Sequence, residues 1–189
     1  MSETNQIIRY GDPVLRRKAQ PVKKVTPQVR DVAERMMDCL ERAGGLGLAA
    51  PQVGCGLRLI IYDVGEGPVA VVNPRIQQST GLVEAVEGCL SLPRLYGDVQ
   101  RAEQVVVKAT DLRGHPITIE AQDLLARVLQ HEIDHLEGVL FVDRVNPATL
   151  HWLVGDAAQE DPQQRVQTTL EDALKVFEAR QASHTAAEE

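Results

Sequence analysis

The feature that most constrains the fold is a helical segment, about 121–137, that contains His131-Glu132-Ile133-Asp134-His135. Apolar residues recur along it at the i, i+3, i+4 spacing of one helix face: Leu124, Leu125, Val128, Leu129 and Leu136. His131 and His135 are one helical turn apart, so both imidazoles project from the same side. Two aligned imidazoles can bind a divalent metal, and Glu132 is placed to take the proton of a metal-bound water. The alternative is an exposed helix whose charged residues only face solvent, with His131 and His135 as chance neighbours.

A catalytic metal site needs a third protein ligand and an open position for water. The candidate donor is Cys89, which lies between a strand-like stretch at 82–86 and the break at Pro93. Gly88 beside it would let the backbone approach a metal closely. Taken alone, Cys89 could equally be a small buried apolar residue, which is common for a free cysteine.

A further segment, Gly45 to Gly54, is rich in small residues that allow a tight path of the backbone. Within it, Gln52 offers a side-chain amide that can donate a hydrogen bond to an oxyanion. Gly47 would lie where a side chain would obstruct the substrate. The alternative is an ordinary turn after a helix, because a short Gly/Ala-rich run carries little information by itself.

Together the three segments resemble the peptide deformylases, which remove the formyl group from the initiator methionine of new chains. That family carries G-x-G-x-A-A-x-Q, E-G-C-L-S and Q-H-E-x-D-H in this order. All three motifs are intact here, at 45–52, 87–91 and 130–135. The resemblance covers about Ile7 to Val145.

The resemblance implies a role for each motif residue. The metal ligands would be Cys89, His131 and His135, the catalytic acid/base would be Glu132, and the oxyanion donors would be Gln52 and the backbone N–H of Leu90. It also implies ferrous iron, one ion per chain, often replaced by zinc, nickel or cobalt in preparations. A thiolate with two imidazoles suits zinc or iron, and zinc binds more tightly.

An apolar slot beside the metal is expected to select the methionine side chain. Leu124 and Val128 lie on the His131 side of the helix, and Leu46 would form a third wall. Arg127 shares that side and does not fit an apolar slot. Its guanidinium could reach the rim over its own methylenes and pair with an acidic group or touch the peptide. Equally, Arg127 could be a solvated surface arginine.

The loop that carries Cys89 is expected to need support, because metal ligands are usually held in place by further contacts. Family resemblance suggests an ion pair between Glu87 and Arg101 in this role. The alternative is two unrelated surface charges.

Three classes of function are compatible with these motifs. The first is a deformylase that acts through a metal-bound water or hydroxide. The second is a metallohydrolase of the same architecture that acts on another N-acyl group or peptide bond. The third is an inactive, metal-binding homologue that serves as an interaction module, and the intact Glu132 and Gln52 argue against it.

Size, charge and cysteine content indicate the number of domains, the kinds of partner and the cellular location. At 189 residues the chain fits a single domain, and we expect 1–182 to be catalytic and 183–189 to be a disordered tail. The net charge of −7 argues against nucleic-acid binding. No apolar run has membrane-spanning length. Residues Met1 to Tyr10 are polar and lack the apolar core of a signal peptide, and the three cysteines fit no disulfide framework. We expect a cytoplasmic protein, or one in a reducing organelle if a transit segment has been lost.

The expected fold class is α+β, with small antiparallel or mixed sheets around the central metal-binding helix and further helices near both ends. A first helix begins with Thr26 as N-cap and Pro27 at its first position. The expected strands are 57–64, 69–73, 82–86, a hairpin of 104–110 with 116–120, and 139–142. A last helix restarts at Asp161-Pro162 and places Val166, Leu170, Ala173, Leu174 and Phe177 on its apolar face.

The C-terminal helix bears on partners beyond the formylmethionyl nascent peptide. Some bacterial deformylases are thought to dock on the ribosome through a basic C-terminal helix. From Glu160 to Glu189 this chain has three basic residues against seven acidic ones, a balance of −4. That makes docking on a phosphate backbone doubtful, so a transient ribosome contact would need another surface.

Overall fold

The computed structural model describes residues 6–155 and 164–185, and all its named strands pair in antiparallel fashion. One sheet has the strand order β1-β2-β3-β6-β7, with bounds Gly47–Ala49, Leu59–Tyr62, Val69–Thr80, Gln104–Thr110 and Pro116–Gln122. The other has the order β4-β5-β8-β9, with bounds Val83–Cys89, Leu92–Arg101, His151–Val154 and Gln164–Gln167. The α-helices are α1 (Pro27–Ala43), α2 (Asp123–Leu136) and α3 (Leu170–Thr185).

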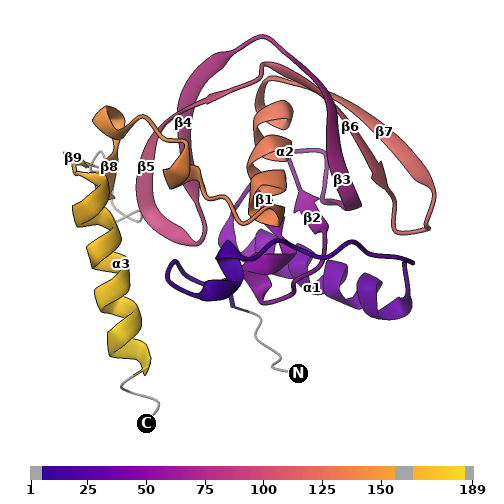
Figure 1. Cartoon of the computed structure of the whole chain (residues 1–189), viewed down its shortest axis with the longest axis horizontal. Helices are drawn as coiled ribbons and strands as arrows, with labels where there is room; N and C mark the ends of the chain where they lie inside the picture. Colours follow the sequence, from indigo (N-terminus) through magenta and orange to yellow (C-terminus); the bar gives the residue numbers. More distant parts are fainter. Residues whose placement is uncertain (1–5, 156–163, 186–189) are drawn as a thin grey trace.

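Helix α2 lies at the centre, between the two sheets (Figure 1). One side of it packs on the first sheet through Ala126, Leu129, Ile133 and Leu136, which join a buried cluster with Ile60, Val71, Val105 and Val107. Helix α1 covers the opposite face of that sheet. Burial of α2 on this sheet leaves its histidine-bearing side facing β4, and this arrangement confirms the α+β expectation.

Helix α1 begins where the sequence predicts. Thr26 is the N-cap, although its side chain makes no capping hydrogen bond, and Pro27 is the first helical residue. Gly44 ends the helix with a φ of 61°, in the left-handed region that glycine adopts readily. The chain therefore turns directly into the Gly45 to Gln52 segment.

The prediction of a strand at 139–142 is wrong. The region forms a short 3-10 helix, η3 (Phe141–Asp143), because the Asp143 carboxylate accepts a hydrogen bond from the Leu140 N–H at 2.8 Å. Phe141 and Val142 are buried there, so their apolar character reflects the core and not a sheet. The other 3-10 helices are η1 (Pro13–Arg16), η2 (Ala50–Val53) and η4 (Pro147–Thr149).

Strand β5 runs through Pro93, where the sequence predicts a break. Pro93 is its second residue, and it falls where the pairing of β4 with β5 shifts register, between Gly88–Tyr96 and Cys89–Leu92. No backbone N–H is required from a residue at such an irregularity. The proline is therefore compatible with the strand.

The C-terminal region differs from the expectation in its first part. Val166, expected on a helix face, lies in β9 opposite Trp152 of β8, and Asp161-Pro162 fall outside the described residues. Helix α3 buries Ala173 and Phe177 as predicted, and it continues through Thr185, into the expected tail. Within the described residues, no helix is both long and apolar enough to cross a bilayer.

Candidate active site

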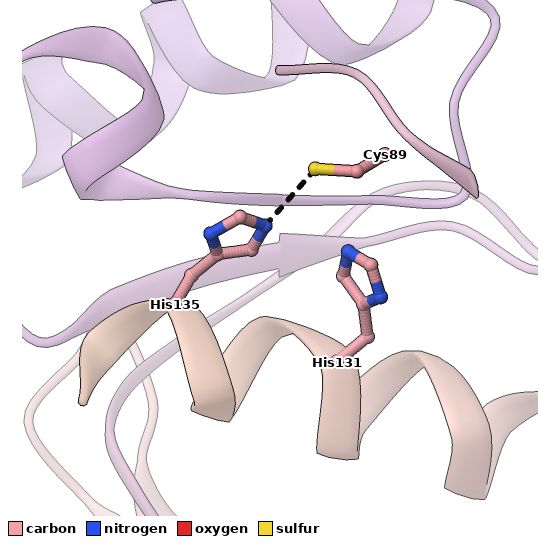
Figure 2. Close-up of side chains that lie close together, drawn as sticks. All are labelled: Cys89, His131 and His135. Atoms are coloured by element: carbon pink, nitrogen blue, oxygen red, sulfur yellow. Dashed lines mark hydrogen bonds between the residues drawn. The ribbon is translucent and has the colours of Figure 1, made fainter. Parts of the chain in front are cut away.

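Three possible metal donors converge between β4 and α2. Cys89 is the last residue of β4, and His131 and His135 lie one turn apart on α2 (Figure 2). One donor atom from each lies within 4.8 Å of the other two, and His135 Nε2 is 3.3 Å from the Cys89 sulfur. Burial lowers the pKa of His135, which favours the neutral imidazole that metal binding requires.

Glu87 fixes the orientation of His131. The Nδ1 atom of His131 lies 2.9 Å from Glu87 Oε2, so the other ring nitrogen is directed away from this carboxylate. Burial raises the pKa of Glu87, but hydrogen bonds from His131 and Arg101 outweigh it and leave the pKa at about 2. Glu87 is therefore a carboxylate at neutral pH. A histidine held by a carboxylate in this way is common in metal sites.

The expected contact between Glu87 and Arg101 is present, as part of a larger network that is buried except at Arg144. Arg101 donates to both oxygens of Glu87, at 2.9 and 3.0 Å, and to Asp134 at 2.5 Å. Arg144 donates to both oxygens of Asp134, at 2.6 and 2.7 Å. The network ties β4, β5 and α2 together behind the three donors, because each carboxylate is shared between side chains from different elements.

Arg127 is a second cation on Glu87, and the solvated surface alternative is wrong. Only 9% of the residue is exposed, and its guanidinium donates to Glu87 Oε1 at 2.7 Å. The same group donates to the backbone carbonyls of Val83 and Val99, each at 2.9 Å. The guanidinium of Arg127 is thus held on the side of β4 and β5, while the residue also contributes to the wall of the cavity described below.

Glu132 points to the space beside the donors and is buried. Its Oε2 atom has no hydrogen-bond partner among the described residues. Burial, the largest contribution, raises the pKa of Glu132 to about 7. A Cβ atom on Gly47 would lie 2.5 Å from Glu132 Oε1. Gly47 therefore makes room for Glu132, a contact that differs from the expected obstruction of substrate.

Gln52 lies on the other side of the donors, on η2. Its Oε1 accepts from the Ala49 N–H at 2.8 Å, which directs its Nε2 toward Ser91 Oγ at 3.2 Å and the Cys89 sulfur at 3.7 Å. Leu90 follows Cys89 in the turn between β4 and β5 and is partly buried. The amide N–H groups of Gln52 thus face the space next to the thiol.

A cavity of about 550 Å³ opens onto these side chains. Its wall includes all four residues predicted for the substrate pocket, namely Leu46, Leu124, Arg127 and Val128. It also includes Gly47, Gln52, Cys89, Leu90, His131 and Glu132. Leu46 and Leu124 are each 47% exposed, so each has apolar surface that a ligand could cover.

Three residues of the site were not predicted: Ser91, Asp134 and Arg144. Ser91 and Asp134 stand inside the motifs E-G-C-L-S and Q-H-E-x-D-H, and this position was a signal that they contribute. Arg144 lies outside all three motifs. Arg144 contacts Asp134 only because the segment after α2 folds back toward that helix. The sequence pattern does not reveal this fold.

Comparisons with known proteins agree with this geometry. The family model for polypeptide deformylase matches residues 4–151. A peptide deformylase of Desulfitobacterium hafniense is 50% identical over 139 residues, which is 74% of this chain and 93% of that protein. The crystal structure of a peptide deformylase from Thermotoga maritima superposes with a TM-score of 0.73 at 44% identity, over 75% of this chain and 97% of that chain.

A plant peptide deformylase structure superposes with a TM-score of 0.80 at 32% identity, over 98% of this chain and 95% of that chain. That likeness extends through the C-terminal part of this chain, beyond the residues that the family model matches. The chain belongs to the polypeptide deformylase family and is an enzyme that removes the N-formyl group from newly made polypeptides.

Proposed function

We propose that Cys89, His131 and His135 hold one catalytic divalent metal. The convergence of their donor atoms is the observation that carries this proposal. The donor set fits a metal for two further reasons. Glu87 binds the Nδ1 of His131 and leaves the other nitrogen available. The cavity opens onto Cys89 and His131, and no fourth donor joins the group among the described residues.

The proposed metal in the cell is ferrous iron, one ion per chain, with zinc, nickel or cobalt able to replace it. A thiolate and two imidazoles suit each of these ions. When bound, such an ion acts as a Lewis acid that polarises a carbonyl and lowers the pKa of water. Metal analysis of protein purified anaerobically, from cells grown without added metal, identifies the ion that is bound.

Glu132 is proposed as the catalytic acid/base. Its carboxylate is buried beside the proposed ligands, and a pKa of about 7 lets it both take up and release a proton near neutral pH. It would accept a proton from the attacking water and pass it to the departing amine nitrogen. Gly47 leaves the space in which this carboxylate lies.

Gln52 and the backbone N–H of Leu90 are proposed to donate hydrogen bonds to the formyl oxygen as negative charge develops on it. The support is that Gln52 Nε2 lies 3.7 Å from the Cys89 sulfur and is held there by the Ala49 and Ser91 contacts. Each donor of this kind is worth about 3 kcal/mol of transition-state stabilisation. Pre-orientation of Gln52 avoids a reorganisation cost during the reaction.

The methionine side chain is proposed to occupy the apolar part of the cavity, between Leu46, Leu124 and Val128. Arg127 borders this slot, but its guanidinium is engaged by Glu87 and the carbonyls of β4 and β5. It would therefore close the slot with its methylenes and leave the charge behind the wall.

We propose that 1–182 act as one catalytic domain. Its C-terminal helix packs on the N-terminal segment through Tyr10 and Phe177, whose ring centroids are 6.1 Å apart. Because α3 is not basic, any contact with the ribosome would use another surface. A substrate that is a newly made polypeptide places the reaction where proteins are synthesised, so the proposed location is cytoplasmic.

The decisive experiment compares formyl-Met-Ala-Ala-amide with acetyl-Met-Ala-Ala-amide, with iron-loaded enzyme prepared anaerobically. Release of formate with little release of acetate is the expected result, because the extra methyl group must fit beside Glu132 and Gln52. Comparable rates on both peptides would show a broader N-acyl hydrolase. No turnover of either, at full metal content, would overturn the proposed roles.

A further inference from the structure

The rim of the cavity is positively charged, although the protein as a whole carries −7. The charged residues of the wall are Arg9, Glu87, Arg94, Arg127, His131 and Glu132. Glu87, Arg127 and Glu132 are buried, and Glu87 and Arg127 belong to the internal network. The two exposed charged residues of the wall are Arg9 and Arg94. Neither forms an ion pair within residues 6–155 and 164–185.

Arg94 is held at this rim by the end of β8. Its Nε donates to the Leu153 carbonyl at 2.9 Å, and Nη2 donates to the Gly155 carbonyl. Its backbone has a φ of 69°, in the left-handed region that few non-glycine residues adopt. Because backbone carbonyls are uncharged, these contacts leave the positive charge of Arg94 without a counter-charge. A guanidinium has five N–H donors, so Arg94 keeps others for a ligand.

Arg9 is held beside the proposed oxyanion donors. The residues on both sides of it are fixed by backbone hydrogen bonds, from Ile8 to the Gln52 carbonyl at 2.8 Å and from Tyr10 to the Ser91 carbonyl at 2.9 Å. Its guanidinium donates to the Leu90 carbonyl. A charge attached to so firmly anchored a backbone loses less entropy when it pairs with a ligand.

The path of the substrate brings its next residues to these two arginines. With the formyl group at Cys89 and Gln52 and the methionine side chain between Leu124 and Val128, the chain must leave by the open side of the cavity. The other exposed residues on that side carry no charge: Ala43, Gly44, Leu46, Val86 and Leu124. Among the residues that the structure describes, a side chain that follows the methionine therefore meets two cations and no exposed carboxylate of the wall.

We propose that Arg9 and Arg94 make this enzyme select formyl peptides with an acidic side chain in the first or second residue after the methionine. The inference rests on the proposed placement of the formyl group and methionine. Arginine pairs well with carboxylates, because its planar fork can bind both oxygens. The pairs would be exposed at the rim, so their effect on kcat/KM is modest and sensitive to salt.

The test measures kcat/KM for formyl-Met-Ala-X-amide and formyl-Met-X-Ala-amide, where X is Glu, Gln or Lys. The amide removes the terminal carboxylate, which would otherwise bind the same arginines. In at least one series we expect Glu to exceed Lys by about fivefold at low salt, with Gln between them, as exposed ion pairs allow. The ratio should fall toward one when about 0.5 M salt is added.

Arg9→Gln combined with Arg94→Asn should abolish the preference for Glu over Lys. Asparagine is chosen at 94 because it tolerates a positive φ. The double variant Arg9→Glu and Arg94→Glu should invert the preference. The matched control is Arg113→Asn, which removes one positive charge from an exposed arginine outside the cavity wall and should leave the ratio unchanged.

Each outcome is decisive. A wild-type ratio near one, or a ratio that survives in the Arg9→Gln/Arg94→Asn variant, would overturn the inference. Hydrolysis of the Gln peptides by the same enzyme keeps the two proposals distinguishable. If the Gln peptides are hydrolysed while the charge preference is absent, only the role of Arg9 and Arg94 fails. If no formyl peptide is hydrolysed, the proposed function itself fails.

Discussion

The guanidinium of Arg127 lies 2.7 Å from the same Glu87 carboxylate that Arg101 binds from the opposite strand. Glu87 is thus held by one cation from α2 and one from β5, and its second oxygen contacts His131. An arrangement of this kind restricts the rotation of the carboxylate. The position of the imidazole at the proposed metal site therefore depends on two arginines that are not ligands.

Replacement of Glu87 by Gln should weaken metal binding by about 10- to 100-fold, as loss of a carboxylate behind a histidine ligand does elsewhere. The amide cannot neutralise Arg101 and Arg127, and it holds the imidazole less firmly. The measurement is the rate and extent of zinc transfer to a coloured chelator. Glu84→Gln, an exposed change on the same strand, is the control. Equal zinc retention in both variants would mean that Glu87 does not support the site.

Replacement of Arg127 by Met should lower the free energy of unfolding by about 3 kcal/mol, because it leaves the buried side of Glu87 and several carbonyl groups without their donor. Urea unfolding of the metal-free protein measures this without the contribution of metal binding. Arg113→Met, at an exposed position, should change the value by less than about 0.5 kcal/mol. A loss below about 1 kcal/mol for Arg127→Met would indicate that water replaces the guanidinium.

Local sequence pattern was sufficient to predict α2, which carries two of the proposed ligands, and also α1 and one hairpin. The apolar spacing of α2 and the Thr26-Pro27 start of α1 depend on residues close together in the chain, so both were predicted. The hairpin of β6 and β7 was predicted for the same reason. The three motifs, through family resemblance, identified Gln52, Cys89, His131, Glu132 and His135, which the structure brings together, but not the contact of Ser91 with Gln52.

The parts that were not predicted depend on contacts between distant segments. Pro93 in β5 is tolerated only because of a register shift against Cys89, and a proline in a sequence does not reveal such a shift. The surroundings of Arg127 come from residues 28 to 44 positions away in the chain, so a polar residue near an apolar stripe gave no indication of its partners. Arg144 reaches Asp134 by the same kind of tertiary contact.

Gly47→Ala should lower kcat by about 10- to 100-fold, since a misplaced catalytic group has an effect of this size. The added Cβ would lie 2.5 Å from Glu132 Oε1 and 2.8 Å from its Cγ, so Glu132 must move. Gly56→Ala is the matched control, because a Cβ there has no neighbour within 4 Å. Steady-state kinetics distinguish displacement of Glu132, which lowers kcat, from obstruction of the substrate, which raises KM. A rise in KM at unchanged kcat would mean that residue 47 obstructs the substrate instead of displacing Glu132.

Glu132→Gln should retain one metal per chain and lose nearly all turnover, by about 10²- to 10⁴-fold, the usual contribution of general acid/base catalysis. The residue is not among the proposed ligands, and an amide of similar shape cannot take up the proton. Metal analysis and formate release are measured on the same sample, with Glu120→Gln, exposed on β7, as control. Near-normal activity at full metal content would show that another group transfers the proton.

The slot between Leu46, Leu124 and Val128 should select an unbranched apolar side chain. Formyl-Met-Ala should have a higher kcat/KM than formyl-Val-Ala, because each buried methylene contributes about 0.8 kcal/mol and a β-branched side chain is stiff at χ1. Formyl-Glu-Ala should be poorer still, since a carboxylate between apolar walls loses hydration at a cost of about 2 kcal/mol or more. The guanidinium of Arg127 offers no compensation, because Glu87 and the carbonyls of Val83 and Val99 already engage it. Comparison of kcat/KM for the three dipeptides checks the assignment. Turnover of formyl-Glu-Ala equal to that of formyl-Met-Ala would mean that Arg127 leaves Glu87 and enters the slot. A glutamate in the slot and a glutamate after the methionine should thus have opposite effects, because the slot is apolar whereas the rim carries Arg9 and Arg94.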